Sequence, residues 1–371
     1  MKLERIELFV VRLPLKFPYE TSGSRETHQT RVIARVESQG LVAWGESVAP
    51  ELPWYSGETP ETVWWLLDSI AIPRLLASDL AGPEDTSRVL GWIKDHRMAK
   101  ATLEMAVWDL FAKAAKVSLS KLLGGTRDRI LCGVAIGIQE SSDALLDKIA
   151  KELDGAAYQR VKVKIKPGWD AEIAKAIRAR FPDLPFQLDA NSAYTLADVP
   201  LFKRMDEYKT LLVEQPLAAD DIIDHATLQK QISTPVCLDE SIHSAEDARK
   251  AIELGATRVI NIKAGRVGGL LESKKIHDVC EKRGIPVWCG GMLEMGIGRA
   301  ANVHLASLPN FRLPGDVSAS SRYFATEIIA EPFTVEKDGT MKVPTGPGIG
   351  VTVLEDVIRK IALRTKEYRP A

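Results

Sequence analysis

Five charged residues recur at an almost constant interval in the middle of the chain, each near the end of a short apolar run. They are Lys164, Asp189, Glu214, Asp239 and Lys263, and successive members lie 25, 25, 25 and 24 residues apart. The apolar runs have the length of strands, and helix-like stretches such as 171–181 and 244–255 lie between them. A strand plus a helix, repeated, is the unit of a parallel α/β fold.

Further units extend this series on both sides. Strand-like runs occur at 130–137 and 285–291, and we expect an eighth strand near Phe311–Asp316. Within one helix-like stretch, Ser244 and Asp247 suit the start of a helix and Gly255 suits its end. Seven or eight units favour a closed barrel over an open doubly wound sheet. We therefore predict an α/β fold, a modified TIM-type (β/α)7β barrel.

The sequence on either side of these units has a different pattern. Residues 1–50 alternate apolar and polar side chains, as in a β-hairpin or meander, and 98–116 has the spacing of an amphipathic helix. Near the end of the chain, Asp338-Gly339 between alternating residues indicates a hairpin. We expect an α+β segment at 1–125, the barrel at 126–320, and a C-terminal segment with strand character at 321–371.

Three of the recurring residues are carboxylates on adjacent strand ends, where barrels of this type carry their catalytic groups. Asp189, Glu214 and Asp239 would repel one another strongly unless a cation lay among them. Ligands that are all oxygen favour a hard divalent ion, Mg²⁺ first and Mn²⁺ next. No histidine stands at these strand ends, which argues against zinc.

Lysines flank the three acids in the series. In a barrel, the strand of Lys164 lies across the mouth from that of Lys263, and the two-residue period of a strand directs Lys162 inward together with Lys164. A lysine beside a divalent cation and another lysine should have a lowered pKa, which makes it usable as a base near neutrality. Two lysines on opposite faces of one carbon are what a racemase needs. For Lys162, simple pairing with a carboxylate is an equally good interpretation.

At this point the sequence resembles the enolase superfamily, and within it the N-succinylamino acid racemase / o-succinylbenzoate synthase family. The resemblance covers nearly the whole chain. It is carried by HRMAKATLEMAVWDL (96–110), VKVKIKPGWD (161–170), LDANSAY (188–194), EQPLAADD (214–221), CLDESI (237–242), NIKAGRVGG (261–269), WCGGMLEMGIGRAAN (288–302), LPGDVSASSRY (313–323) and VPTGPGIGV (343–351). The Lys-x-Lys motif with a distant lysine differs from the His-Asp pair of the mandelate-racemase type.

This resemblance implies a role for each residue of the series. Asp189, Glu214 and Asp239 would bind Mg²⁺ (or Mn²⁺), Lys164 and Lys263 would be the two acid/base groups, and Lys162 would act electrostatically near the substrate carboxylate. It also implies that the two flanks form a capping domain, whose loops near Thr21–Arg25 and Leu52–Ser56 close over the barrel.

The resemblance implies a small carboxylate substrate that loses its α-proton while an enediolate is stabilised. Two reactions begin in this way: racemisation of N-acyl (N-succinyl) amino acids, and the dehydration that forms o-succinylbenzoate in menaquinone biosynthesis. In the dehydration, Lys164 would act as base and then acid, while Lys263 supplies positive charge.

Several positions depart from the family pattern or adjoin the catalytic residues. No aromatic follows Thr21-Ser22, Ala135 replaces a frequent serine, and Met295 stands where a small residue is usual; these differences concern the acyl group and side chain of the substrate. We hypothesise that Arg266 lowers the pKa of Lys263 and favours racemisation, and that Asn191 hydrogen-bonds a metal ligand. A structural role is favoured for Asp316.

The composition is that of an ordinary globular protein, with 45% hydrophobic and 27% charged residues. The 49 Lys and Arg residues nearly balance the 50 Asp and Glu residues, giving a formal charge of -1, so nothing favours binding to nucleic acid or to an anionic membrane. The first residues do not have the pattern of a signal peptide, and the four cysteines show no CxxC spacing. We expect a cytoplasmic homo-oligomer with reduced thiols.

Three alternatives remain open at this point. A dipeptide epimerase or a muconate-type cycloisomerase belongs to the same class, although the segment 314–318 holds only one of the two acids that an epimerase would use for a free amine. A Schiff-base aldolase could carry its lysine at Lys263, but it would leave the three carboxylates without a role. A barrel kept as a binding scaffold would not need two lysines facing a metal site.

Overall fold

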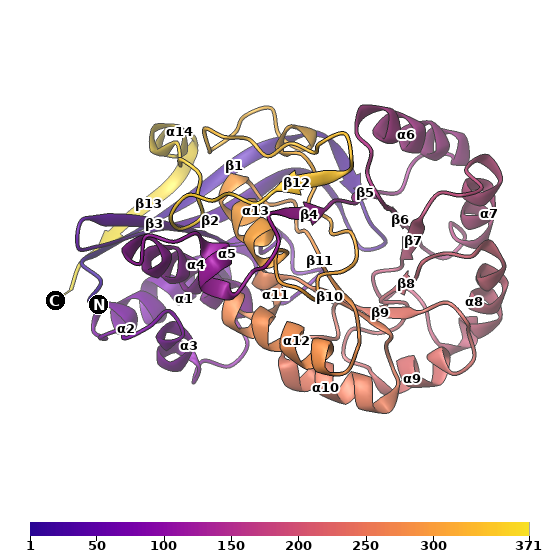
Figure 1. The fold of residues 1–371 in the computed structure, drawn as a ribbon, viewed down its shortest axis with the longest axis horizontal. Coiled ribbons are helices and arrows are strands. Elements are labelled where there is room, and N and C mark those ends of the chain that lie inside the picture. Colours follow the sequence, from indigo (N-terminus) through magenta and orange to yellow (C-terminus); the bar gives the residue numbers. More distant parts are fainter. Residues whose placement is uncertain (371) are drawn as a thin grey trace.

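Seven parallel strands form the curled sheet of the barrel in the computed structural model, which describes residues 1–370 (Figure 1). Each strand pairs with the next one along the chain, so the sheet runs without a crossover from β5 to β11. The strands are β5 (Val134–Ile136), β6 (Val161–Lys164), β7 (Phe186–Asp189), β8 (Val213–Glu214), β9 (Val236–Leu238), β10 (Val259–Ile262) and β11 (Val287–Cys289). The predicted α/β barrel is confirmed.

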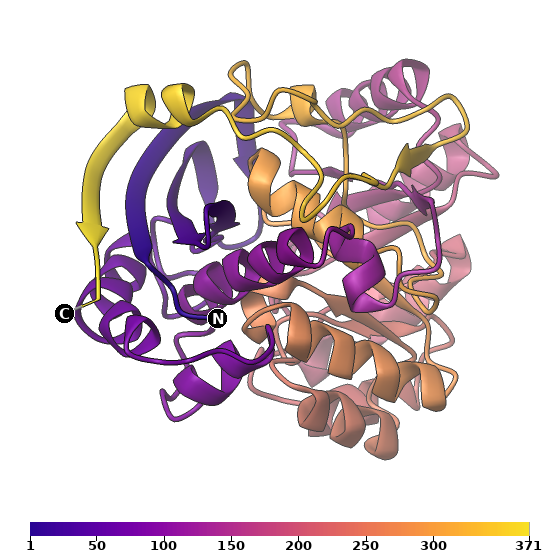
Figure 2. The same ribbon diagram turned by 60° about the vertical axis from the view of Figure 1, so that its left-hand side comes forward.

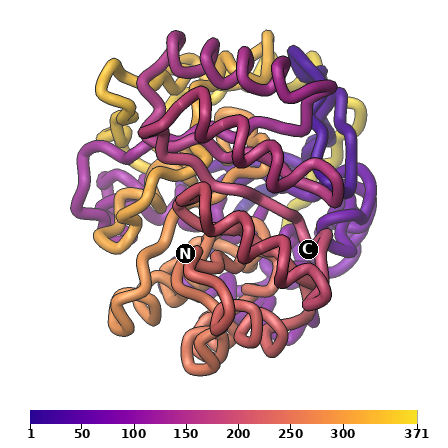
Figure 3. Tube along the Cα trace, turned by 90° about the vertical axis from the view of Figure 1, so that its right-hand side faces the viewer, coloured from indigo at the N-terminus to yellow at the C-terminus, as the bar shows by residue number. Residues whose placement is uncertain are grey.

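Helices follow the strands and cover the outside of the barrel, where Figure 3 shows them in succession. They are α6 (Ser142–Gly155), α7 (Ala171–Arg180), α8 (Val199–Met205), α9 (Ile223–Gln229), α10 (Ala245–Leu254), α11 (Ala264–Val267), α12 (Leu270–Lys282) and α13 (Gly296–Leu305). The predicted ends of α10 are confirmed: Ser244 Oγ accepts a hydrogen bond from the backbone of Asp247, and Gly255 ends the helix with a φ of 70°.

The eighth strand was expected near Phe311–Asp316, and this detail is wrong. The segment makes only isolated bridges, from Phe311 to Val287 and from Gly315 to Cys132. Pro314 has no amide hydrogen to give to a ladder, which explains why regular pairing stops there. The segment still joins the two ends of the sheet, because the amides of Gly133 and Asp316 donate to Gly315 and Cys289 respectively.

A four-stranded antiparallel sheet and a group of helices form the cap. The sheet order is β13-β1-β2-β3, so the C-terminal strand lies beside the N-terminal one (Figure 2). These strands are β1 (Arg5–Glu20), β2 (Arg25–Ser38), β3 (Leu41–Glu46) and β13 (Ala362–Tyr368). The helices of this part are α1 (Pro60–Leu66), a π-helical turn (Leu67–Ala71), α2 (Ile72–Leu76), α3 (Asp85–Leu90), α4 (Arg97–Ala114), α5 (Leu119–Leu123) and α14 (Glu355–Ile361).

The hairpin expected at Asp338-Gly339 is only partly present. A turn forms there, with Gly339 at a φ of 75°, but the strand that follows it pairs with a distant partner. This strand, β12 (Thr340–Lys342), is antiparallel to β4 (Arg129–Leu131) at the start of the barrel. A local alternation therefore identified the turn but not the partner.

Helix α4 is buried on most sides, rather than amphipathic as its spacing suggested. Thirteen of its residues are buried, because it lies between the cap sheet and the barrel (Figure 2). Its buried acids bind backbone amides of other segments: Glu104 accepts from Leu270 and Leu271, and Asp109 accepts from Trp44. No helix among residues 1–370 is long and apolar enough to cross a membrane.

Gly45 sets the distance between strand β3 and helix α4, which gives a stability prediction. A Cβ atom at this position would lie 1.9 Å from the backbone oxygen of Thr102. Backbone cannot move aside as a side chain can, so Gly45→Ala should destabilise the fold by about 3 kcal/mol, measured by urea unfolding. Gly155→Ala is the matched control, because nothing lies within 4 Å of its Cβ position. Equal stability of the two variants would contradict this packing.

Candidate active site

The parallel register places the recurring charged residues at the same level of the sheet. Lys164 is the register partner of Asp189, and Asp189 is the partner of Glu214. Asp239 directly follows β9 and Lys263 directly follows β10, and all five side chains are buried. An interval of 25 residues in the sequence thus becomes a row of neighbours at the carboxyl ends of the strands.

The carboxylates and the two proposed acid/base lysines form close ion pairs. Lys164 Nζ lies 2.6 Å from Asp189 Oδ2, and Lys263 Nζ lies 2.8 Å from Asp239 Oδ2. Burial alone would lower the pKa of Lys263, but the neighbouring Asp239 carboxylate raises it above its ordinary value. Burial would raise the pKa of Asp239, but Lys263 and Arg266 lower it well below its usual range.

Lys162 lies deeper in the barrel and is surrounded by acids. Its Nζ atom is 2.6 Å from Asp316, 3.0 Å from Asp189 and 3.2 Å from Glu214. Although burial opposes the charged form, these carboxylates raise its pKa well above the ordinary value. Asp316 also accepts from Arg160 at 2.7 Å. Lys162 and Asp316 therefore belong to one buried network that holds this end of the barrel together.

Arg266 and Asn191 lie beside the predicted metal ligands, as expected, but they make different contacts from those predicted. The guanidinium of Arg266 donates to Asp239 Oδ1 and to the backbone oxygen of Asn261, so its charge acts on the carboxylate and not directly on Lys263. The side chain of Asn191 accepts from Lys164 at 2.7 Å and donates to Glu240, and only its backbone amide donates to Asp189. The effect of Arg266 on racemisation stays a prediction.

The two cap loops reach the strand ends, as expected. Ser22 Oγ donates to the backbone oxygen of Ala190, 3.1 Å away, just after β7. Tyr55 OH donates to Asp239 Oδ1 at 2.7 Å and accepts from Lys263 Nζ at 3.1 Å. Burial, and next Asp239, raise the pKa of Tyr55, so the phenol keeps its proton and remains a donor.

Tyr55, Glu240 and Asn261 are site residues that the sequence analysis did not single out. Glu240 follows Asp239 directly, and Asn261 stands two residues before Lys263 on the same strand face. Their positions next to predicted site residues could have identified them from the sequence. Tyr55 lies in a predicted loop without periodicity, so only the loop could be named. Asn261 Nδ2 donates to Glu214 Oε1 at 2.9 Å.

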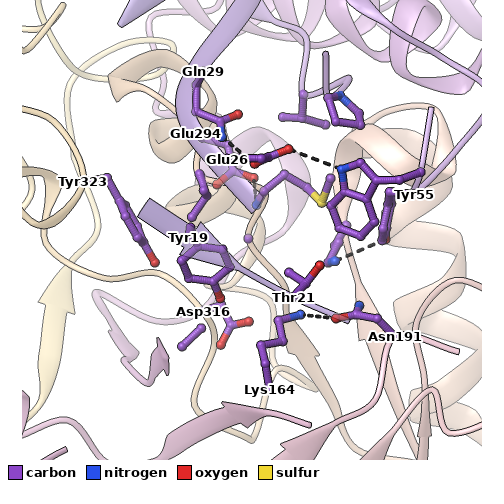
Figure 4. Close-up of a pocket in the computed structure, with 18 of the residues that line it drawn as sticks. Tyr19, Thr21, Glu26, Gln29, Tyr55, Lys164, Asn191, Glu294, Asp316 and Tyr323 are labelled. Carbon is purple, nitrogen blue, oxygen red and sulfur yellow. Dashed lines mark hydrogen bonds between the residues drawn. The ribbon is translucent and has the colours of Figure 1, made fainter. Parts of the chain in front are cut away.

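A cleft lies between the cap loops and the strand ends (Figure 4). Lys164 and Lys263 both line it, as do Tyr19, Ala135 and Trp54. Trp54 packs on Gly23, and a Cβ atom at Gly23 would lie 3.2 Å from the indole. The Trp54 ring therefore lies beside the position after Thr21-Ser22, where an aromatic residue was expected from the family. Met295 is buried outside the cleft, so its difference from relatives does not bear directly on substrate.

Tyr55 links the cap to Asp239 and Lys263, which leads to a prediction for Tyr55→Phe. The variant should slow turnover about tenfold, because Lys263 and Asp239 lose a shared hydrogen-bond partner. The loss should be larger for the enantiomer whose α-proton exchange in D₂O requires Lys263, as identified with Lys263→Ala. Tyr368→Phe is the matched control, since its phenol donates to Asp68 in the cap at 2.9 Å. Equal slowing of both enantiomers would contradict the assignment.

The oxygen donors at the strand ends have the chemistry that suits a hard cation, although oxygens of Asp189, Glu214 and Asp239 do not all lie within 4.8 Å of one another. Asp189, Glu214 and Asp239 are fully buried on adjacent strands, and Asn261 Oδ1 and Glu240 Oε2 are buried oxygens with no hydrogen-bond partner in the described chain. Lysine ammonium groups reach these carboxylates from the side of β6 and β10. Buried oxygens without donors are what a divalent ion stabilises.

A second acidic group lies on helix α12, away from the cleft. Ligand atoms of His277, Asp278 and Glu281 lie within 4.8 Å of one another. However, His277 Nε2 already accepts from the backbone of Asn310, and Asp278 pairs with Lys274 at 2.8 Å. No acid/base lysine of the cleft contributes to this group, so we do not assign it a role in the reaction.

Comparisons with known proteins agree with this geometry. Residues 5–124 match the family described as the mandelate racemase / muconate lactonizing enzyme N-terminal domain, and residues 144–357 match the enolase C-terminal domain-like family. An o-succinylbenzoate synthase of Geobacillus kaustophilus is 49% identical, covering 95% of this chain and 94% of the relative. An N-succinylamino acid racemase of Thermus thermophilus is 48% identical, covering 98% of each.

A solved structure has the same fold over the full length. The crystal structure of an enolase-superfamily member from Listeria innocua aligns with a TM-score of 0.95 and 40% identity, covering 100% of this chain and 99% of that one. Members of this superfamily typically bind Mg²⁺. The chain therefore belongs to the enolase superfamily of enzymes, in the N-succinylamino acid racemase / o-succinylbenzoate synthase family.

Proposed function

We propose that this enzyme racemises N-succinyl amino acids by two-base proton transfer. Lys164 removes or returns the α-proton on one face of the substrate carbon, and Lys263 does so on the other face. The observation that carries this proposal is that both ammonium groups line the same cleft, from strands on opposite sides of the sheet. A single base could exchange the proton but could not invert the centre.

The carboxylates of the strand ends would hold the cofactor. Asp189, Glu214 and Asp239 would bind Mg²⁺ (or Mn²⁺), which supplies positive charge for the substrate carboxylate and for the enediolate that follows proton loss. Lys162, 3.0 Å from Asp189 and 3.2 Å from Glu214, supplies positive charge beside both carboxylates. Asn191 and Asp189 both accept hydrogen bonds from Lys164 Nζ, which limits the directions in which this amine can reach.

The dehydration that yields o-succinylbenzoate is a second candidate, because relatives of nearly equal similarity bear each of the two names. Both reactions start with removal of an α-proton at the same carboxylate. Lys164 would then act as base and as acid toward the departing hydroxyl, while Lys263 remains cationic. The enzyme would then act in menaquinone biosynthesis, in which o-succinylbenzoate is formed.

Two alternatives are less well supported. An epimerase needs a free acid for the substrate amine, but Asp316 is already paired with Arg160 and Lys162. An aldolase would use Lys263 alone and would leave the buried carboxylates of Asp189 and Glu214 without a role in the reaction.

The proposal is tested by proton exchange and rate comparison. In D₂O with Mg²⁺, either enantiomer of an N-succinyl amino acid should exchange its α-proton for deuterium and should lose its optical rotation. Exchange is measured by ¹H NMR and racemisation by polarimetry. Rates of racemisation and of o-succinylbenzoate formation, measured side by side, would rank the two reactions. Exchange without racemisation would contradict a two-base mechanism.

A further inference from the structure

The cleft has two chemically different ends. Lys164 and Lys263 line the cleft from the strand ends, whereas Glu26 and Gln29 of β2 line it from the cap (Figure 4). The lining includes the apolar side chains of Val48, Pro50 and Trp54 and the carboxylate of Glu26, which accepts a hydrogen bond from the Trp54 indole at 3.3 Å. A carboxylate beside apolar side chains is an unusual lining for a purely aliphatic group.

The carboxylate of Glu26 is held in place by neutral donors only. Its Oε2 atom accepts from Gln29 Nε2 at 2.7 Å, and its Oε1 atom accepts from Trp54 Nε1 at 3.3 Å. Across residues 1–370, it has no Lys, Arg or His nitrogen within 4 Å that would form an ion pair. The side chain is half-buried and lines the cleft; its charge also acts on the nearby guanidinium of Arg31, which lies too far away for an ion pair.

The other charged groups of this region are already engaged. The guanidinium of Arg31 donates to the backbone oxygens of Ala49 and Met292, and its Nε atom lies 4.0 Å from Glu46. Glu294 accepts from the backbone amide of Met292 and so holds its own loop. Glu51, on the same side of the cap, is paired with Arg12 at 2.7 Å and with His28.

We propose that Glu26 recognises a cationic side chain, an ammonium or a guanidinium, on the N-acyl amino acid whose α-carbon lies between the two lysines. The methylene stem of a lysine or arginine side chain would lie along the wall of Val48, Pro50 and Trp54, with its charged end at Glu26. The Trp54 indole adds a face that attracts cations. A succinyl carboxylate would be repelled by Glu26 and so is directed to another part of the cleft. This inference rests on the proposed racemisation.

Two substrates of equal stem length isolate the charge. N-succinyl-lysine and N-succinyl-norleucine differ only in the terminal ammonium, so the ratio of their kcat/KM values for racemisation measures its recognition. A hydrogen bond to a charged group changes affinity by about ten- to a hundredfold, and we expect the wild-type enzyme to favour the lysine derivative by at least about tenfold. Glu26→Gln should lower kcat/KM for the lysine derivative toward that of the norleucine derivative, and so remove this preference.

Glu51→Gln is the matched control, since it removes a cap carboxylate that is already ion-paired, and the preference should persist in it. A wild-type enzyme that favours norleucine, or a Glu26→Gln variant that keeps the ratio, would overturn the inference while leaving racemisation intact. If neither substrate exchanges its α-proton in the wild-type enzyme, the proposed racemisation fails and the inference fails with it. Racemisation of N-succinyl-norleucine by the Glu26→Gln variant shows that this variant is folded.

Discussion

Lys263→Ala is expected to lower racemisation at least about a thousandfold and yet to leave α-proton exchange from one enantiomer. Removing a positioned general base typically costs a factor of this size. Lys164 would still take the proton from its own face and return deuterium to the same face, so that enantiomer gains deuterium without inversion. The fold should tolerate the change, because Asp239 keeps its contact with Arg266. The measurement is ¹H NMR of each enantiomer in D₂O together with optical rotation.

Lys164→Ala is the mirror-image experiment. Asp189 keeps Lys162 at 3.0 Å, so the carboxylate remains paired, and exchange should now survive only in the opposite enantiomer. Loss of exchange from complementary enantiomers would assign one face to each lysine. If either variant racemises at the wild-type rate, or if both variants lose α-proton exchange from the same enantiomer, the two-base assignment is wrong.

The strand order could be predicted because it depends on a local repeat. Each βα unit supplies its own apolar strand, and neighbouring units pair in sequence, so a period of 25 residues determined the sheet from β6 to β10. The errors concern contacts between distant segments. The partner of β12 is β4, about two hundred residues earlier, and Glu104 of α4 is buried because it accepts from amides of Leu270 and Leu271. No local pattern specifies such partners.

The same distinction applies to the site. The groups that end the strands were predictable, since parallel strands in register bring residues such as Asp189 and Glu214 side by side. The groups that come from the cap were not, because Tyr55 and Glu26 belong to a loop and a strand end whose position over the barrel depends on packing of the whole cap. The residues that we propose to determine substrate preference therefore lie where the sequence pattern is least informative.

Glu214→Gln should abolish stabilisation by Mg²⁺ as well as activity. The substitution conserves shape, and Lys162 keeps Asp189 and Asp316 as partners, so the variant should fold. It removes one of the three charged ligands that we propose for the ion, and we expect turnover to fall at least about a thousandfold. A ligand present at a hundred times its Kd stabilises a protein by about 2.7 kcal/mol. Mg²⁺ should therefore raise the Tm of the wild-type enzyme measurably, and that of the variant much less.

The acids on α12 provide the control for this experiment. Asp278→Asn changes the group formed with His277 and Glu281, so a shift in Tm that persists in Asp278→Asn and disappears in Glu214→Gln would place the stabilising ion in the barrel. The opposite pattern would place it on α12 and contradict the assignment at the strand ends. EDTA should abolish activity of the wild-type enzyme, whereas an aldolase would remain active and would be trapped by borohydride with its substrate. Lys164 and Lys263 are not expected to replace the charge of the ion, because each is already paired with a carboxylate, Asp189 or Asp239.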